Sequence, residues 1–386
     1  MYLLRKGAVI ASLLVFSLLA AVFGSAAALD AMYGGRIQKG LIADGVDIGG
    51  LLPDEAAEKL KNSLPPLEGA YLVVEGEGRS FYIEFADIEG SYDIEGMTAA
   101  AQKYSGGTKG AERLLHILRL RAEQKELPPV FSCNKEKLAQ KISELKAAWD
   151  TPAKDAAVLW NSEKGVLIEE EIAGLEIDGP ATLERVQKAL ECGRLRAQSV
   201  EHTRAPSVTA SQLAGIDSLL AAYTTSFDAE AANRAHNITL ASGKLNGSVV
   251  SPGETFSLNS RLGPRGEGEG YKPAPVFWEE GLGMDAGGGV CQVATTLYNA
   301  VLLAGLPVVE HHHHPQPVVY APEGRDATIA GDYLDLKFLN NTPAPVYIAS
   351  AVRGNRITVS LFGAGGGRAP AVDGYPRPEL HPVLEK

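Results

Sequence analysis

Apolar residues spaced three or four apart predict several helices in the first half of the chain. Three such runs each follow a short alternation of apolar and acidic residues. They predict helices over 53–64, 98–104 and 181–190. The clearest helix is predicted over 135–149, where Asn134 is the expected N-cap and one apolar stripe ends at Trp149. We expect that stripe to be buried core.

Short apolar runs between these helices predict β-strands. They cover 70–74, 80–85, 157–160 and 166–169, and residues 161–165 form the expected turn of the last hairpin. Residues 40–200 are therefore expected to form an α+β region of repeated strand, turn and helix. The polar segment 201–209, which contains Pro206, is the expected linker to a second region.

The second half has a different pattern. Glycine and proline are dense between Gly243 and Gly289, which is typical of short strands joined by tight turns. One strong helix is predicted from Cys291 to Gly305. Further strands are predicted over 318–320, 333–339, 346–352 and 356–362. This pattern indicates a mainly β second region with one central helix that starts at Cys291. The Gly/Pro-rich segment 363–386 is expected to be disordered.

The first 29 residues indicate the compartment. Arg5 and Lys6 precede an uncharged stretch, and residues 8–29 are long enough to span a bilayer core of about 30 Å. This predicts an N-terminal membrane helix with the remainder outside the cytoplasm. Ala26-Ala27-Ala28 also fits a signal-peptidase site, so a cleaved signal is the alternative. Either route places the bulk of the chain in an extracytoplasmic location.

Composition narrows the class of protein. The chain has 386 residues, of which 45% are hydrophobic and 22% charged, so it is globular and long enough for two domains and a tail. Its formal net charge of −11 argues against nucleic acid as a partner, because binding phosphates requires Lys and Arg. Three cysteines are too few for a disulfide scaffold, although Cys133 and Cys192 are a possible pair.

Candidate chemistry lies where the predicted central helix begins. Cys291 directly follows Gly287-Gly288-Gly289-Val290, and the positive end of a helix favours the reactive thiolate form of cysteine. Gly288, Gly289 and Gln292 are candidates for an oxyanion or substrate loop. The run His311–His314 follows, and then Asp326. A nucleophile, an imidazole base and an orienting carboxylate are thus present in that order.

Each of these residues has an alternative role. Cys291 fits a small buried hydrophobe, and Asp326 fits a turn cap. In a strand, His312 and His314 would share a face, which suits either a metal pair or a catalytic base with a structural partner. Cys291, two histidines and Asp326 also form a possible zinc ligand set. The residues otherwise indicate no cofactor and no resident metal.

Residues 220–362 resemble the VanW domain, named after an accessory protein of vancomycin-resistance clusters. The resemblance rests on 255–259, 262–265, 270–272, 287–299, 311–320 and 324–328. The family pattern has Arg and Ser where this chain has His311 and Pro315, and its two histidines fall on His312 and His314. The resemblance implies substrate-binding roles for Arg265, Tyr298 and Tyr320.

The preceding region resembles the peptidoglycan-binding domain often found upstream of VanW domains. That similarity covers roughly residues 60–195. Together the two resemblances imply a membrane-anchored cell-envelope protein that binds peptidoglycan or its stem peptides. The alternative is a thiol-dependent acyl transferase or amidase, with Cys291 as nucleophile, His314 or His312 as base and Asp326 as orienting group. The order Cys, His, Asp is also similar to that of transglutaminase-like thiol enzymes.

Overall fold

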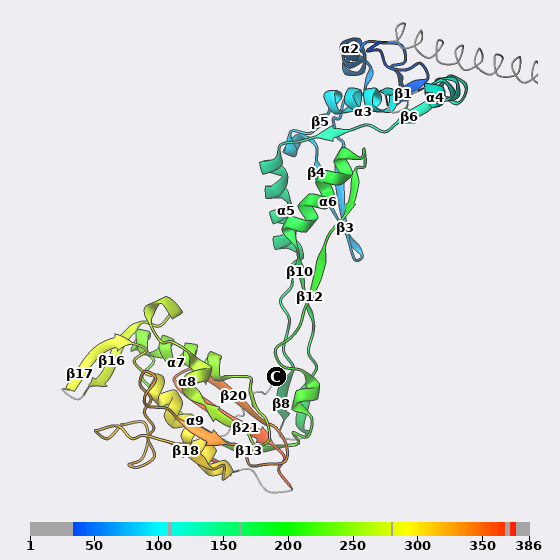
Figure 1. Cartoon of the computed structure of the whole chain (residues 1–386). Coiled ribbons are helices and arrows are strands. Elements are labelled where there is room, and N and C mark those ends of the chain that lie inside the picture. Colours follow the sequence, from blue (N-terminus) through cyan, green and yellow to red (C-terminus); the bar gives the residue numbers. More distant parts are fainter. Residues whose placement is uncertain (1–33, 107–109, 162–163, 279–280, 367–370, 376–386) are drawn as a thin grey trace, which may run out of the picture. The chain divides into compact units, whose positions relative to one another are not determined.

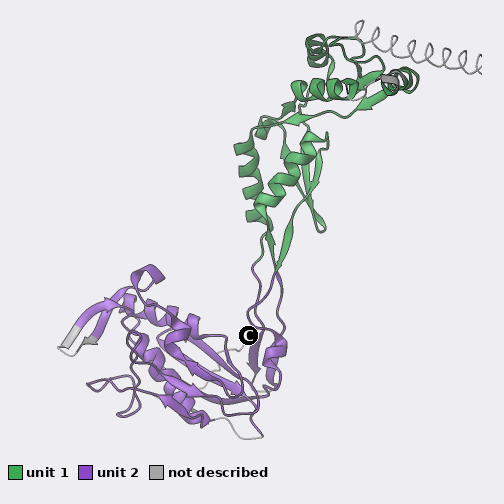
Figure 2. Ribbon diagram, viewed as in Figure 1, with its two compact units in different colours: residues 1–151, 175–203 green, residues 152–174, 204–386 purple. Residues whose placement is uncertain are grey.

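The structure is a computed structural model that describes residues 34–106, 110–161, 164–278, 281–366 and 371–375. These residues form a mixture of helices and strands (Figure 1), which confirms the predicted α+β class. The chain divides into two compact units (Figure 2). Unit 1 comprises residues 1–151 and 175–203, and unit 2 comprises 152–174 and 204–386.

Unit 1 consists of short sheets and helices around two apolar clusters. Strand β11 pairs parallel with β3, and β3 pairs antiparallel with β4. A second small sheet has the order β2-β1-β6. The elements are β1 (Leu41–Ala43), β2 (Val46–Asp47), α2 (Pro53–Ser63), β3 (Tyr71–Gly76), β4 (Arg79–Glu84), β5 (Ser91–Tyr92), α3 (Ile94–Gly106), α4 (Gly110–Glu123), β6 (Lys125–Leu127), β7 (Phe131–Ser132), α5 (Lys135–Trp149), β10 (Gly174–Ile177), α6 (Gly179–Glu191), β11 (Arg196–Gln198) and β12 (Glu201–Arg204).

Helix α5 follows directly from its local sequence. The side-chain oxygen of Asn134 accepts hydrogen bonds from the backbone N–H groups of Glu136 and Lys137, at 3.0 and 3.2 Å. These bonds satisfy two donors that the start of a helix leaves without intrahelical partners. The predicted apolar stripe of α5 is buried as far as Trp149. The cap and the spacing of apolar residues therefore account for the bounds of this helix.

Unit 2 has a five-stranded sheet in the order β14-β20-β21-β13-β22. All neighbours are antiparallel except β13 and β22. Helix α9 packs on β13 and β21, and α7 packs on β20 (Figure 1). The elements of this unit are β8 (Ala157–Asn161), β9 (Gly165–Glu169), β13 (Ser218–Ser226), α7 (Ala232–Leu245), β14 (Ser248–Val250), β15 (Thr255–Ser257), α8 (Leu258–Leu262), β16 (Pro273–Trp278), β17 (Gly281–Ala286), α9 (Val290–Ala304), β18 (Val308–Glu310), β19 (Lys337–Leu339), β20 (Val346–Arg353), β21 (Arg356–Gly363) and β22 (Ala371–Tyr375).

Both faces of this sheet are covered. On β20, Val346 and Ile348 belong to the large cluster beneath α7 and α9, whereas Tyr347 and Ala349 face a smaller cluster on the opposite side. That smaller cluster includes Val158 of the hairpin β8–β9. The hairpin therefore packs in unit 2, although its residues fall within the region 40–200 that the sequence predicted as one domain.

Several expectations about the second half are wrong. The sequence predicted one central helix, but α7 lies beside α9 in the same layer. Residues 318–320 form no strand, and only the end of the predicted strand 333–339 forms β19. The predicted disordered tail contains β22, which pairs with β13. These strands depend on partners distant in the sequence, which local patterns do not reveal.

The predicted membrane helix over residues 8–29 lies outside the residues that the structure describes. Among those that it does describe, no helix is long and apolar enough to cross a membrane. Cys133 and Cys192 are free thiols in the structure.

Candidate functional site

A glycine turn places Cys291 at the second residue of α9. Gly289 is the N-cap and has a φ of 108°, a left-handed backbone conformation that residues other than glycine rarely adopt. A Cβ atom on Gly288 would lie 2.6 Å from the carbonyl oxygen of Ala274 and 2.7 Å from that of Pro275. The turn therefore requires glycine at both positions, because any larger side chain would strain or obstruct the backbone.

The thiol of Cys291 lies among polar groups. Its sulfur is 3.4 Å from Thr328 Oγ1 and 3.6 Å from the carbonyl oxygen of Ile329. It also shares a hydrogen bond with the side chain of His314. Cys291 itself is half-buried. The alternative role of Cys291 as a small buried hydrophobe does not account for these three polar neighbours.

His314 lies between the thiol and a carboxylate. Its Nδ1 is 2.7 Å from Oδ2 of Asp326, and only 5% of its side chain is exposed. Because Nδ1–H donates to Asp326, the nitrogen left to face Cys291 is Nε2. The structure thus brings together Cys291, His314 and Asp326 in the order that the sequence predicted.

Asp326 also organises two other histidines of the run. Its Oδ2 accepts a hydrogen bond from the backbone N–H of His314 at 2.7 Å, and its Oδ1 accepts one from His313 Nδ1 at 2.9 Å. Its main-chain oxygen accepts one from His311 Nε2 at 2.7 Å. The ring of His311 stacks on Tyr298 with centroids 4.0 Å apart. His311 and His313, on which the two family histidines do not fall, therefore hold the Asp326 loop.

His312 is directed elsewhere. Its Nε2 is 3.1 Å from Glu310 Oε1, and Glu310 in turn pairs with Lys337 at 2.8 Å. The expectation that His312 and His314 share a strand face is wrong, because residues 311–314 form no strand. The segment through Asp326 also forms no strand, and a backbone hydrogen bond from Thr328 N–H to His312 O joins the two segments at 2.9 Å. The geometry therefore selects His314 as the imidazole beside Cys291.

The pKa shifts of the three groups favour an ion pair. Burial opposes ionisation of Cys291, but hydrogen bonds from His314 and Thr328 outweigh it and lower the pKa of the thiol below its ordinary 9.0. Burial likewise opposes protonation of His314, but Cys291 and Asp326 outweigh it and raise the pKa of the imidazole above 6.5. Despite burial, the backbone N–H and ring of His314 lower the pKa of Asp326 to about 2.

Polar residues of α9 bind the backbone of the segment that carries Asp326. Thr295 Oγ1 donates to Ala327 O at 3.1 Å and accepts from Ala327 N–H at 3.0 Å. Asn299 Nδ2 donates to Arg325 O at 2.7 Å. Cys291, Thr295 and Asn299 are spaced four apart and so share one helix face. Thr295 and Asn299 were not among the residues predicted from the sequence, and their spacing of four from Cys291 is the signal that identifies them.

Gln292 does not serve the substrate loop in the way the sequence predicted. Its side chain is fully buried, and its Oε1 accepts a hydrogen bond from Arg234 Nη2 at 2.7 Å. Its Nε2 donates to Thr225 Oγ1 at 3.0 Å and to Ser226 O at 2.9 Å. Its backbone N–H donates to Gly289 O at 3.0 Å. Gln292 therefore anchors the first turn of α9 to β13 and holds the Arg234 guanidinium.

Tyr320 and Arg265 have distinct surroundings. The ring of Tyr320 lies 6.5 Å from that of His314 and 5.7 Å from the guanidinium of Arg234. Burial and then the charge of Cys291 raise the pKa of its phenol. Arg265 instead lines an open polar cleft of about 850 Å³, whose lining does not include Cys291 or His314. Tyr320 is thus beside the candidate triad, and Arg265 is in the adjoining cleft.

The residues that the structure describes contain no group of three or more His, Cys, Asp or Glu side chains arranged to hold a metal ion. The zinc alternative placed two histidines beside Cys291, whereas His312 contacts Glu310 instead.

Two families match the chain. Residues 233–362 match the model described as "VanW like protein", and residues 81–197 match the model described as "Putative peptidoglycan binding domain". Residues 233–362 are therefore similar to VanW proteins. The VanW match contains Cys291, His314 and Asp326, and the two matches together support a cell-wall-related function.

Two curated relatives agree with the VanW match. "Uncharacterized protein YoaR" of Bacillus subtilis (strain 168) is 39% identical over 158 residues, which cover 41% of this chain and 52% of the relative. "Vancomycin B-type resistance protein VanW" of Enterococcus faecalis (strain ATCC 700802 / V583) is 30% identical over 135 residues, which cover 34% of this chain and 49% of the relative. The aligned part thus spans about half the length of each relative. No solved structure matches the chain.

Proposed function

We propose that the VanW domain of this chain is a cysteine-dependent acyl-transfer enzyme, an amidase or transferase, that acts on cell-wall peptides. The observation that carries the proposal is the placement of His314 between the Cys291 thiol and the Asp326 carboxylate. The sequence favoured recognition of a wall peptide without chemistry. Recognition alone requires no thiol with a lowered pKa, whereas acyl transfer does.

The geometry supports a two-step reaction. The Cys291 thiolate attacks a peptide carbonyl carbon, and the carbonyl electron pair moves to its oxygen. The backbone N–H of Cys291 lies at the second position of α9 and has no intrahelical acceptor, so it is the candidate donor to that oxygen. When the C–N bond breaks, the protonated Nε2 of His314 gives its proton to the departing amine and a thioester remains. Water or a second amine then attacks the thioester, gives its proton to His314 and releases the thiolate.

The peptidoglycan-binding match in unit 1 supports the choice of substrate. In this proposal, that region holds the chain on peptidoglycan and the VanW domain acts on its stem peptides. We also propose that residues 1–29 anchor the chain in the membrane, with the described units in the extracytoplasmic cell envelope. Fractionation with membranes tests the anchor, and a mature N-terminus near Ala28 would contradict it.

The test of the chemistry is the pH dependence of cysteine alkylation, mapped residue by residue with iodoacetamide. We expect Cys291 to react at a lower pH than Cys133, because hydrogen bonds lower the pKa of Cys291 whereas burial raises that of Cys133. Wild-type protein incubated with wall peptides should also carry an acyl group on Cys291, visible by mass spectrometry. The Cys291→Ala variant should carry none. Equal alkylation profiles for the two thiols and full turnover by Cys291→Ala would reject the enzyme and leave recognition alone.

A further inference from the structure

We propose that the polar cleft beside the Cys291 turn binds a peptide that carries both a free carboxylate and a free ammonium group. This inference rests on the proposed function, since it names the substrate class of the same site. The cleft has a volume of about 850 Å³, within the range of about 300–1,000 Å³ that ligand sites occupy. Its lining is more polar than apolar, which favours a charged ligand.

Two segments that position the thiol also form walls of the cleft. Asp285 and Ala286 line it and lead directly into the glycine turn before Cys291. Gly331 lines it as well and lies two residues after Ile329, whose carbonyl oxygen contacts the Cys291 sulfur. A ligand in the cleft is thus bordered by the same two backbone segments that hold the nucleophile.

Some charged groups of the cleft already have partners. Asp335 is buried, and its carboxylate accepts hydrogen bonds from Ser257 Oγ at 2.5 Å and from Asn259 N–H at 2.9 Å. Lys337 pairs with Glu310 at 2.8 Å. These two residues therefore maintain the wall of the cleft, and their charges are compensated within the protein.

Arg265 has a different environment. Its Nη1 donates to Asn259 Oδ1 at 2.9 Å and its Nη2 to Gly331 O at 3.2 Å, both of them uncharged acceptors. Among the described residues, no carboxylate lies within ion-pair distance of this guanidinium. Two bonds hold its orientation while further N–H groups remain, and a guanidinium can bind a carboxylate through two charge-assisted hydrogen bonds. Arg265 is therefore the expected contact for the ligand carboxylate.

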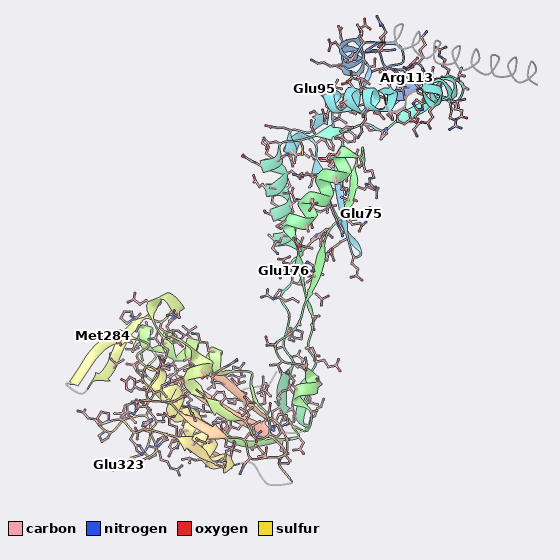
Figure 3. The ribbon with its side chains drawn as sticks, viewed as in Figure 1. Glu75, Glu95, Arg113, Glu176, Met284 and Glu323 are labelled. Carbon is pink, nitrogen blue, oxygen red and sulfur yellow. The ribbon has the colours of Figure 1, made fainter. Side chains whose placement is uncertain are left out.

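Asp285 and Asp332 supply the opposite charge. Both are exposed, and neither has a cation within ion-pair distance in the part of the chain that the structure describes. The Asp285 carboxylate accepts one hydrogen bond, from the backbone N–H of Ala286 at 2.7 Å. Asp285 follows Met284, which Figure 3 labels on the β16–β17 hairpin. The cleft thus offers the carboxylates of Asp285 and Asp332 and the guanidinium of Arg265. A ligand that bears both an ammonium and a carboxylate group fits this combination.

The experiment measures binding with catalysis removed. Full-length protein with Cys291→Ala is titrated by calorimetry with acetyl-Ala-Lys-Ala, which has a free carboxylate and a lysine amine, with either enantiomer as its last residue. The same peptide is then tested as its carboxamide and as its Nε-acetyl form. We expect each blocked form to bind at least about 10-fold more weakly, the range of a charge-assisted hydrogen bond.

Variants assign each ligand charge to its side chain. Arg265→Gln should weaken the free-carboxylate peptide about 10-fold and leave the carboxamide unchanged. Asp285→Asn should weaken the free-amine peptide and leave the Nε-acetyl form unchanged, while Asn keeps an oxygen for the Ala286 N–H. Arg261→Gln is the matched control, since Arg261 also donates to a backbone carbonyl, that of Asn246 at 3.2 Å, but lies outside the cleft lining. Glu230→Gln is the control for a lost exposed carboxylate.

The outcomes separate this inference from the proposed enzyme. No binding to the Cys291→Ala protein, or equal affinities for the free and blocked peptides, overturns the cleft assignment. If wild-type protein still cleaves or transfers the blocked peptides, the enzyme stands without this substrate class. Charge-dependent binding without any turnover by wild type supports the cleft and rejects the enzyme.

Discussion

The two units of this protein differ in where their polar side chains lie. Unit 1 pairs its charges at the surface, as in Lys137 with Glu89 and Lys141 with Asp87. Unit 2 buries many more polar side chains than unit 1 does among the described residues. In unit 1 they are Gln38, Thr98, Ser105, Thr182 and Ser199; in unit 2 they are Thr224, Thr225, Asn237, Ser242, Ser248, Gln292, Thr295, Thr296, Asn299, Asp326, Asp335, Asn340, Ser350 and Ser360.

This difference has a physical meaning. A buried polar group costs free energy unless it is hydrogen-bonded, and a well-packed apolar residue would stabilise the fold equally well. In unit 2 several of these groups lie on α9, where Gln292, Thr295 and Asn299 hold the turns that carry Cys291 and Asp326. The buried polar network therefore marks the region in which positioning of the site outweighs simple stability.

The sharpest test of the comparison is a pair of histidine variants. His314→Ala should lower the acyl-transfer rate by about 10²–10⁴-fold, because it removes the group that moves the proton. Burial would then dominate at Cys291, so its thiol pKa should rise and its alkylation at neutral pH should slow. His312→Ala, which loses only the contact with Glu310, should retain most activity. Equal effects of the two variants on both readouts would remove His314 from its assigned role.

A matched glutamine pair tests the contrast between buried and exposed polar groups. Gln292→Ala should lower the free energy of unfolding by about 3 kcal/mol, since it removes hydrogen bonds to the partly buried Arg234 guanidinium, the Thr225 hydroxyl and the Ser226 carbonyl oxygen. Gln140→Ala on α5 should change it by less than about 0.5 kcal/mol, because Gln140 is exposed and makes one long bond of 3.5 Å. Chemical denaturation of both proteins supplies the measurement, and similar midpoints would contradict the comparison.

A glycine pair tests the turn before Cys291. Gly288→Ala should destabilise unit 2 by about 2 kcal/mol and displace the nucleophile, because the added Cβ meets two backbone carbonyl oxygens. Gly268→Ala is the control, since a Cβ there meets nothing within 4 Å. Thermal unfolding and Cys291 alkylation should both change in the first variant only. An unchanged alkylation rate in Gly288→Ala would show that the turn does not position the thiol.

The smallest effect is expected for the surface charges of unit 1. Lys137→Met removes the ion pair with Glu89, but both side chains are exposed and water screens their attraction. We expect the unfolding midpoint to stay within experimental error at physiological salt. A clear loss of stability would show that unit 1 also depends on its polar contacts, and the comparison between the units would fail.

Sequence patterns predicted elements that local contacts form. The bounds of α5 agree with prediction, and α9 was displaced by one residue, because caps, apolar spacing and glycines act within a few residues. Helix α7, strand β22 and the placement of hairpin β8–β9 in unit 2 were not predicted. Each of these packs against residues that are far away in the sequence.

The candidate site divides in the same way. The sequence by itself determined which chemical groups exist, a cysteine at a glycine-bounded helix start, a histidine run and a later aspartate, because residue type and helix position set their chemistry. Only the tertiary structure decided that His314 rather than His312 meets the thiol, and that Gln292 holds Arg234. Residues 311–314 form neither helix nor strand, so no regular repeat sets the directions of their side chains. Those directions depend instead on contacts with Asp326, Glu310 and Tyr298.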